Sequence, residues 1–326
     1  MRKSNRKGAA ENVWKYILKR IFYSILTIFF LIMLTFFMMQ LLPGDPFVGD
    51  KAVDPVVLEE LHAKYGLDKP VPEQFVRYVI NICKGDLGID LKTKRPITQT
   101  IAESFPISFE LGIRSLIFAS IMGFFLGVLA AVKRGTKWDT GAMLIALIGI
   151  SVPSFIMGAI LQYFLGFKLF QWTGVRVFPI LGWNTEMSKL LPSFALSFGS
   201  MASISRLMRT SMLDVMSSDY IKTAKAKGLS KMKIIWRHGV RNAVLPVVTF
   251  LGPQAAALLT GAFVVENIFN IPGLGKFFVI GVQNNNYTMI TGTTLFYGAF
   301  LVVANLIVDL LYGVIDPRVK LAGGKE

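Results

Sequence analysis

The sequence predicts an all-α protein that crosses a membrane with six helices. Of its 326 residues, 53% are hydrophobic and only 17% are charged, whereas soluble domains carry about 25% charged residues. The charged residues gather in segments that separate long apolar runs, as they do in polytopic membrane proteins. The basic residues also alternate in density from one such segment to the next, which is the pattern that membrane topology requires.

Six apolar runs are candidates for membrane spans. About 20 helical residues cross a hydrocarbon core of about 30 Å. Five runs meet this length, and a sixth is less apolar because it is rich in Ser, Ala and Gly. Small residues let helices approach closely, so we expect the sixth run to cross while buried against its neighbours, with a re-entrant segment as the alternative. The expected spans are residues 18–42, 108–132, 141–167, 190–208 (the Ser-rich run), 244–266 and 292–315.

The Lys and Arg residues predict that both termini lie in the cytoplasm. The expected inner segments hold 22 of the 35 basic residues, and the outer ones hold 12. Eight of these 12 lie in the long outer segment 43–107, where ten acidic residues accompany them. The first apolar run is too long for a signal peptide and no small-x-small site follows it, so we expect an uncleaved first helix. The inner segments are 1–20, 133–140, 206–243 and 316–326, and the other outer ones are 168–189 and 267–291.

This topology divides the chain into three regions. Residues 1–107 would form a cytoplasmic tail, the first transmembrane helix and a long extracytoplasmic loop. Residues 108–316 would form a core of five transmembrane helices with a cytoplasmic loop at 206–243, and residues 317–326 a cytoplasmic tail.

The long extracytoplasmic loop is expected to contain two short helices. Asp54-Pro55 opens the first, which runs towards Lys64, and Pro72 opens the second. We expect both helices to pack on the outer rim of the bundle, with a docking surface for an extracytoplasmic partner as the alternative. An apolar stripe at helical spacing marks the second helix: Phe75, Val76, Val79, Ile80 and Cys83.

Several functional classes are disfavoured by what the chain lacks. Cys83 is the only cysteine, and the two histidines, His62 and His238, fall on opposite sides of the expected membrane, so no disulfide or metal site is predicted. We find no carboxylate pair within a span, which leaves a membrane enzyme without catalytic residues. Charge within the spans is too sparse for an ion-gradient-driven transporter. The net charge of +15 flanks apolar runs, which indicates contact with membrane lipid and no nucleic acid.

Polar side chains within the spans are candidates for a translocation path. Such groups are costly in lipid and tend to face the interior of a bundle. Ser154 and Gln162 in the third span and Gln254 and Thr260 in the fifth could donate or accept hydrogen bonds along a path. The alternative for each is a hydrogen bond between helices.

Other residues in the spans are assigned structural roles. Glu110 and Arg114 are four residues apart and should form an ion pair. Asp309 should lie near the inner interface beside a basic residue, and Gly123-x-x-x-Gly127 should be a packing face. Pro153 and Pro253 could kink their spans.

The cytoplasmic loop has the pattern helix, glycine, helix. Ser217 and Ser218 can cap a helix through residues 219–227, and Gly228 allows the left-handed turn that ends it. A second helix begins at 231–238 and leads to Pro246 at the fifth span. A short helix held parallel to the membrane is better suited to transmit a movement than to serve only as a linker between two spans.

Residues in this loop resemble a known family. Thr223-Ala224-x-x-x-Gly228, followed by Leu245-Pro246, resembles the "EAA" loop of ABC importer permeases, with Lys222, Thr223 and Ala243 as departures from the general pattern. The run 220–228 is very similar to the version in the oligopeptide/dipeptide (nickel) branch. Further marks of that branch follow in order: Leu42-Pro43-Gly44-Asp45-Pro46, Gly66-Leu67-Asp68-Lys69-Pro70, Gly85-Asp86-Leu87-Gly88, Val152-Pro153-Ser154-Phe155, Arg237-His238, Arg241-Asn242, Val265-Glu266, Pro272-Gly273-Leu274-Gly275, Asp309-Leu310-Leu311-Tyr312 and Asp316-Pro317-Arg318.

The resemblance implies a permease subunit with the type I ABC importer bundle, in a bacterial cytoplasmic membrane. Its partners would be a second homologous permease, two cytoplasmic ABC ATPases and an extracytoplasmic peptide-binding protein. The cargo would be short peptides, with a nickel chelate or glutathione as the alternative. The helix at 218–230 would couple to an ATPase through Asp219, Tyr220, Lys222, Thr223, Ala224, Lys225, Ala226, Lys227, Gly228 and Leu229.

ATP and Mg²⁺ would then belong to the partner subunits, and this chain would bind no cofactor. In agreement with that expectation, the sequence has no nucleotide-binding P-loop. The nearest pattern, Gly273-Leu274-Gly275-Lys276, lacks the upstream glycine and the hydroxyl residue of that motif.

Overall fold

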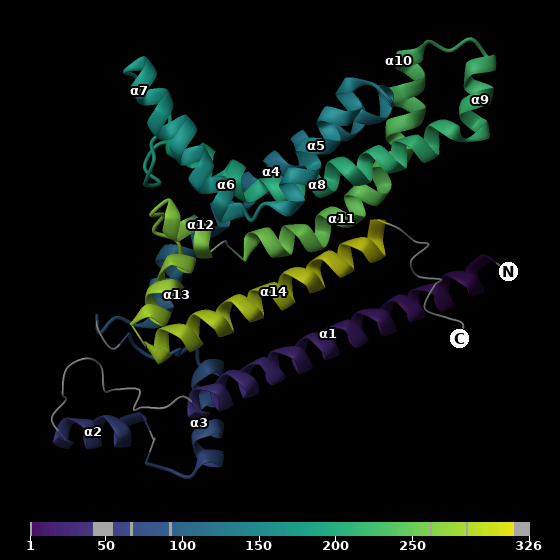
Figure 1. The fold of residues 1–326 in the computed structure, drawn as a ribbon. Coiled ribbons are helices and arrows are strands. Elements are labelled where there is room, and N and C mark those ends of the chain that lie inside the picture. Colours follow the sequence, from purple (N-terminus) through teal and green to yellow (C-terminus); the bar gives the residue numbers. More distant parts are fainter. Residues whose placement is uncertain are drawn as a thin grey trace. The chain divides into compact units, whose positions relative to one another are not determined.

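The computed structural model describes residues 2–41, 55–65, 68–90, 93–260, 263–284 and 286–315, and within these ranges it contains helices and no strand (Figure 1). The expected motif at 42–46, the cap Asp54, the pair Gly66-Leu67 and the tail 317–326 lie outside the described residues. The helices are α1 (Arg2–Leu41), α2 (Pro55–Tyr65), α3 (Val71–Cys83), α4 (Ile97–Val132), α5 (Lys137–Ser151), α6 (Ser154–Leu161), the π-helical η1 (Gln162–Lys168), α7 (Leu169–Thr173), α8 (Glu186–Ser217), α9 (Asp219–Ala226), α10 (Lys231–Lys233), the π-helical η2 (Ile234–Val240), α11 (Arg241–Leu259), α12 (Phe263–Ile268), α13 (Leu274–Gln283) and α14 (Tyr287–Ile315).

Contacts divide the chain into two compact units. One comprises Met1–Pro106 with Lys276–Glu326, and the other is Ile107–Gly275. Helices α4 and α13 each pass from one unit into the other. This division is one of packing, and the three regions of the expected membrane topology stay a prediction.

Four described helices are long and apolar enough to cross a membrane, and a bent pair of helices is a possible fifth crossing. The four are residues 17–38 of α1, 97–132, 231–259 and 287–310. Helix α8 covers the expected Ser-rich span 190–208 and has 32 residues, a length of about 48 Å. It is too polar to meet the same criterion, so its crossing, and with it the count of six, stays a prediction.

The third expected span, 141–167, is not one continuous helix. Helices α5 and α6 meet at Val152-Pro153 with a bend of 112°, which Figure 1 shows as a V. Proline has no N–H to donate and forces the preceding residue out of the helical region, and Val152 is accordingly extended at φ −94° and ψ 120°. The expected kink at Pro153 is confirmed, and it is a complete break.

The fifth expected span lies in a helix that begins well before it. Helix runs without interruption from Lys231 to Leu259, so Pro246 lies inside it rather than at its start. Pro253 is also internal. Prolines are tolerated inside membrane helices where neighbouring groups satisfy the freed carbonyls. Residues 263–266 of the expected span belong to the separate helix α12.

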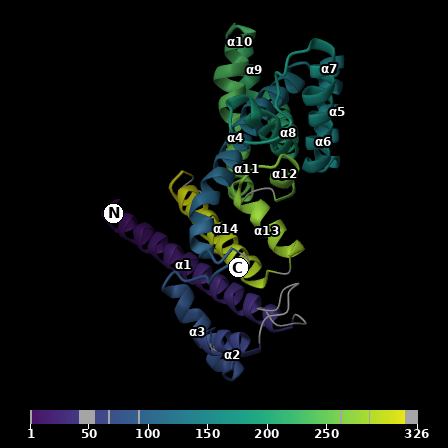
Figure 2. The same ribbon diagram turned by 90° about the vertical axis from the view of Figure 1, so that its left-hand side faces the viewer.

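In the first unit, α1 and α14 lie side by side (Figures 1 and 2). Gly298 of α14 faces Leu31 so closely that an added Cβ would overlap the leucine side chain. Arg20 forms an ion pair with Asp309 at 2.8 Å, which confirms the expected basic neighbour. The hydrogen bond from Asn286 to Asp90, at 2.7 Å, ties the turn after α3 to the start of α14.

Helix α3 packs on α1 with a face that includes only part of the predicted stripe. Phe75 and Tyr78 contact Phe36, with ring centroids 5.3 and 5.6 Å apart. Val76 and Ile80 of the expected stripe are 54% and 45% exposed, and Cys83 is exposed as well. Phe75 of the expected stripe therefore packs on α1 as predicted, whereas Val76, Ile80 and Cys83 do not. The position of the two loop helices on the outer rim of the bundle stays a prediction. Aromatic side chains of α1 determine which face of α3 packs against it, and the spacing of residues within α3 does not contain that information.

In the second unit, α4, α5 and α11 pack against α8. An added Cβ at Gly123 or Gly127 of α4 would come within 2.7 Å of α8 backbone oxygens, so the expected Gly-x-x-x-Gly packing face is confirmed. Gly149 of α5 meets α8 in the same way, with Ala202 2.7 Å from the position of its missing Cβ. Glycine therefore lets two helices approach α8 at backbone distance.

Candidate functional site

The candidate site is the hairpin around α9, built entirely within the second unit. Helix α8 ends at Ser217, α9 occupies Asp219–Ala226, and the helical run that contains α11 begins at Lys231 (Figure 1). The short helix is therefore carried on two legs, one of which is a described apolar span.

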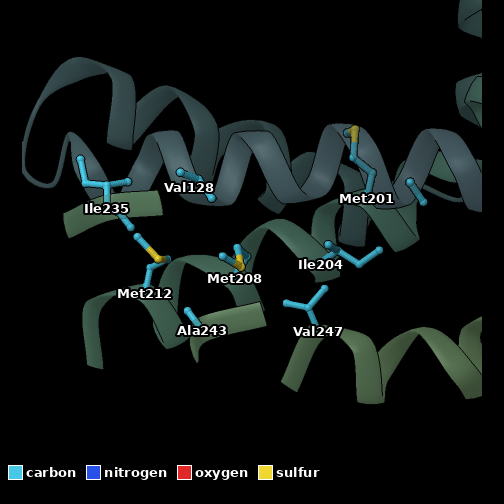
Figure 3. Packing of buried hydrophobic residues seen from close by; sticks show 10 residues of the cluster. Val128, Met201, Ile204, Met208, Met212, Ile235, Ala243 and Val247 are labelled. Carbon is cyan, nitrogen blue, oxygen red and sulfur yellow. The ribbon is translucent and has the colours of Figure 1, made fainter. Parts of the chain in front are cut away.

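The two legs are held together by a hydrophobic cluster that also includes α4. Met208 and Met212 of α8 meet Ile235 of η2 and Ala243 of α11, and all four are buried. Figure 3 shows Met212 and Ile235 pointing towards each other. The cluster therefore joins the two legs to each other and to α4. The cluster comprises Ala119, Val128, Ala131, Met201, Ile204, Met208, Met212, Ile235, Ala243 and Val247.

A smaller cluster attaches α9 to its legs. Ile221 and Ala224 lie one turn apart on the inner face of α9 and pack with Ile234 of η2. Met216 and Leu229 close this cluster from either end of α9. Residues three or four apart lie on the same face of a helix. Helix α9 has only eight residues, and its packing through this one face attaches it to the rest of the protein.

Gly228 ends α9 in the left-handed conformation that the sequence predicts, with φ +72°. The Leu229 N–H donates to the Ala224 carbonyl at 3.3 Å, and the Gly228 N–H donates to the Lys225 carbonyl at 2.9 Å. These two bonds define a Schellman motif, and the contact of Leu229 with the Ala224 cluster is its usual hydrophobic partner. An added Cβ at Gly228 would meet nothing within 4 Å, so the constraint on this residue is its backbone conformation alone.

The N-terminus of α9 differs from the prediction. Ser218 occupies the N-cap position, but its hydroxyl makes no capping bond to α9. It donates instead to the Val215 carbonyl at 2.6 Å, and the Ser217 hydroxyl donates to the Asp214 carbonyl at 2.8 Å. Both hydroxyls therefore satisfy carbonyls at the end of α8, which are orphaned where a helix stops.

The opposite face of α9 is exposed. Lys222 pairs with Asp219 at 2.8 Å with both side chains largely in solvent, and the Tyr220 hydroxyl accepts from the Asn242 amide at 3.3 Å. Of the ten residues predicted to couple, Ala224 is buried and Leu229 half-buried, so these two support the helix from within. The exposed members are Asp219, Tyr220, Lys222, Thr223, Lys225, Ala226, Lys227 and Gly228.

The four candidate path residues are not gathered into one site by any contact that we find among the described residues. Gln162 donates to the carbonyls of Ile180 and Ile268, at 2.9 and 3.2 Å. Gln254 donates to Ser200 of α8 at 2.7 Å, which is the interhelical bond considered as its alternative role. Thr260 donates to the Ala257 carbonyl at 2.7 Å, and Ser154 is half-buried at the start of α6. A role in a path stays a prediction for all four.

The expected pair of Glu110 and Arg114 is present, at 2.8 Å, and belongs to a larger network. Lys189 of α8 bonds to Glu110 and to Glu186, each at 3.0 Å, and Arg114 also pairs with Glu186. The Trp183 indole N–H donates to the second Glu110 oxygen at 3.1 Å. The network joins α4 to the first turn of α8.

Sequence reasoning missed the residues that hold the hairpin in place. Ile221 and Ile234 are apolar residues in a basic loop, and their apolar character there is the signal that could have found them. Asp139 and Arg209 form a pair 70 positions apart in sequence, and neither residue had a distinguishing local pattern.

The chain matches two family models over most of its length. Residues 123–321 match the binding-protein-dependent transport system inner membrane component, and residues 13–112 match the N-terminal part of such membrane components. The chain belongs to this family. The matched regions include α9 and both of its legs.

Relatives from several bacteria cover nearly the whole permease. The dipeptide transport system permease protein DppB of Bacillus subtilis is 42% identical over 310 residues, which are 94% of this chain and 98% of the relative. The oligopeptide transport system permease proteins OppB of Haemophilus influenzae and Salmonella typhimurium are 39% and 40% identical over 309 residues, or 94% of this chain and 99% of each relative.

A solved structure shows the same fold. The MetNI methionine ABC transporter in an inward-facing conformation contains a chain that aligns with a TM-score of 0.51 and 18% identity. The alignment covers 70% of this permease and 97% of that chain. At this identity the likeness establishes the helical permease fold, and the family assignment rests on the sequence comparisons.

Proposed function

We propose that this permease forms half of the translocation pathway of an ATP-driven importer of short peptides. The observation that carries the proposal is the α9 hairpin: a short helix fixed by Ile221 and Ala224, closed by Gly228, and displaying an exposed face between two long helices. The printed names of the relatives, which are dipeptide and oligopeptide permeases, support the cargo.

The hairpin acts as the coupling element. ATP binding and hydrolysis in two cytoplasmic ATPase subunits would displace α9, and the buried methionine cluster would pass this displacement to α8, α11 and α4. ATP and Mg²⁺ belong to those partners, and this chain contributes no catalytic group. A second homologous permease would complete the pathway, and an extracytoplasmic binding protein would deliver the peptide.

The charge distribution supports a multi-pass arrangement in the cytoplasmic membrane with both termini inside. The hairpin segment 206–243 carries nine of the 35 Lys and Arg residues, more than any other expected loop. This orientation places α9 on the side where the ATPases and ATP are found.

Substitution of Gly228 tests the coupling role. In proteoliposomes holding the complete importer and its binding protein, we expect Gly228→Val to lower peptide uptake per ATP hydrolysed by about tenfold. A left-handed residue with a Cβ costs roughly 1–2 kcal/mol, and a β-branched residue more, while each 1.4 kcal/mol corresponds to tenfold. Gly228→Asn should keep most of the uptake, because asparagine tolerates this conformation.

The matched control is Gly174→Val. Gly174 has φ +70° and no atom within 4 Å of an added Cβ, so the backbone cost is the same, but it ends α7 far along the chain from the hairpin. Normal uptake per ATP in Gly228→Val, or an equal loss in both valine variants, would contradict the coupling role of α9.

A further inference from the structure

A bidentate ion pair fastens α5 to α8 near the hairpin. The Arg209 Nε donates to Asp139 Oδ1 at 2.7 Å, and Arg209 Nη2 donates to Oδ2 at 2.9 Å. The Asp139 side chain is 9% exposed and that of Arg209 25%. Two parallel charge-assisted bonds fix the relative direction of two helices as well as their distance, which a single lysine contact does not.

The same carboxylate also holds the turn that precedes α5. The Gly135 N–H donates to Asp139 Oδ2 at 3.0 Å, and Gly135 itself is left-handed at φ +75°. Gly127 of α4 lies against Met208 and the Arg209 backbone nitrogen. Asp139 and Arg209 therefore sit where α4, the α4–α5 turn, α5 and α8 meet.

A second contact makes α5 and α8 a rigid pair. Gly149 lies against Ala202 and the Phe198 carbonyl of α8, ten residues along α5 from Asp139. A helix held at two points ten residues apart cannot pivot freely, because 1.5 Å per residue separates the two contacts by about 15 Å. Any shift of α8 is then a shift of α5 as well.

Beyond Gly149, α5 ends at the break. Helix stops at Ser151, and α6 departs at 112° after Val152-Pro153. Arg209 lies eight residues before the end of α8, after which α9 begins. The ion pair thus joins the leg of the hairpin to α5, a helix that is separated from α8 in sequence by α6, η1 and α7.

We propose that the Asp139–Arg209 pair carries the movement of α9 from α8 into α5, and so to the break at Val152-Pro153. Asp139 and Arg209 are positioning residues for coupling, and they touch no substrate. This inference rests on the proposed function of α9 as the coupling helix. A pair that only stabilised the fold would lower the amount of assembled importer, and with it uptake and hydrolysis in proportion.

The test measures peptide uptake and ATP hydrolysis in parallel, on complexes purified to equal amounts and reconstituted with the binding protein. For Asp139→Asn and Arg209→Gln we expect hydrolysis to persist while uptake per ATP falls about tenfold, the middle of the range that contacting pairs show. Arg209→Lys keeps the charge but loses the bidentate geometry, so its uptake per ATP should lie in between. The exchanged pair Asp139→Arg with Arg209→Asp should recover part of what each single change loses.

Asp309→Asn is the matched control. It removes an interhelical ion pair of similar length, with Arg20, from the other unit and leaves α8 untouched, so its uptake per ATP should be unchanged. The inference is overturned if uptake per ATP is normal in Asp139→Asn and Arg209→Gln, if uptake and hydrolysis fall together, or if the exchanged pair is no better than either single variant.

Gly228→Val in the same assay separates the two proposals. If Gly228→Val lowers uptake per ATP and the Asp139 and Arg209 variants do not, only the ion-pair link fails. If Gly228→Val also leaves uptake per ATP normal, the coupling role of α9 is contradicted. The proposed role of the Asp139–Arg209 pair, which depends on it, is then contradicted as well.

Discussion

Single glycines decide how closely the helices of the second unit approach. At Gly127, an added Cβ would lie 2.6 Å from both the Met208 Cβ and the Ser205 carbonyl oxygen. These neighbours are a buried side chain and backbone, which move only with their helix. The spacing of Gly123 and Gly127 predicted a packing face, but the sequence did not identify α8 as its partner.

Gly127→Val should separate α4 from α8. Overpacking of a well-filled contact costs about 1–3 kcal/mol, so we expect a lower melting temperature in detergent and less assembled protein. Gly141→Val is the control, because it makes the same change inside α5 where an added Cβ meets nothing within 4 Å. Equal melting temperatures for the two variants would show that the close approach of α4 to α8 is not needed.

A buried carboxylate explains the glycines of the Pro272-Gly273-Leu274-Gly275 motif. Glu266 is fully buried, and an added Cβ at Gly273 would overlap its carboxylate and lie 2.6 Å from the Ser108 hydroxyl. The Ser108 hydroxyl accepts the Leu274 N–H at 2.9 Å. The turn is therefore shaped around two polar side chains, one from α4 and one from α12.

A double-mutant cycle tests this account. Gly273→Ala alone should destabilise by about 1–3 kcal/mol, since its methyl group has no room beside Glu266 and Ser108. In a background with Glu266→Ala and Ser108→Ala, the same change should add little, because both obstacles are gone. Thermal unfolding of the four proteins in detergent gives the coupling. Additive losses would mean that the glycine is required for another reason.

At the scale of elements, the sequence predicted which helices form better than it predicted how they bend and pack. The long apolar runs predicted α1, α4, α11 and α14, because burial of apolar surface in lipid demands length and composition that are read locally. Pro153 predicted a kink, but not the 112° between α5 and α6. That angle depends on partners far away in the sequence, such as Phe269 beside Gly158, which no local pattern contains.

The α9 hairpin shows the same division. Gly228 predicted the end of α9, because this end depends only on the left-handed backbone conformation of the glycine itself. The direction of α9 depends on Ile221 and Ala224 packing with Ile234, and the Asp139–Arg209 pair depends on α5 reaching α8. These contacts are set by tertiary structure, so the sequence indicated the exposed residues of the proposed coupling helix and missed the buried residues that support it.

The packing of α3 on α1 changes the titration of Tyr78, and this change can be measured. Burial raises the pKa of Tyr78 to about 12 from its ordinary value of 10.0, because it disfavours the charged phenolate. The folded state therefore keeps this proton between the two values, and the stability contributed by the buried phenol is present below pH 10 and lost as pH rises towards 12.

The near-ultraviolet phenolate absorbance of the protein minus that of Tyr78→Phe isolates this group. We expect the difference to titrate near pH 12. A Tyr78 difference curve centred at its ordinary value would mean that α3 does not cover Tyr78 with α1.

At the scale of the whole molecule, charge asymmetry predicts which side each loop occupies. Basic residues near the inner leaflet gain about 1 kcal/mol each from anionic lipid, so 22 of them on one side strongly favour one orientation. Cys83 at the end of α3 is exposed and is the only cysteine in the chain, which makes the orientation measurable without redesign.

A membrane-impermeant maleimide should label Cys83 in intact cells from outside. In a Cys83→Ser background, Lys227→Cys at the end of α9 should be labelled only after the membrane is permeabilised, because we place the hairpin in the cytoplasm. Cys83→Ser alone is the unlabelled control. Labelling of Lys227→Cys in intact cells would reverse the orientation and remove α9 from the reach of ATPases.

The polarity of α8 has a consequence for how the protein is made. Two of its serines bond to their own helix, Ser197 to Phe194 and Ser203 to Gly199, and α8 packs against α4, α5 and α11. A helix of this composition gains little from leaving a translocon into lipid on its own. Because α4 and α5 are synthesised before α8, they can provide a surface on which α8 packs. Helix α11 is synthesised after α8 and cannot do so. We therefore expect chain order to supply the folding template for α8 as the predicted fourth span. A defect at the α4 or α5 glycines should then appear as failed insertion of α8 before any transport could be measured.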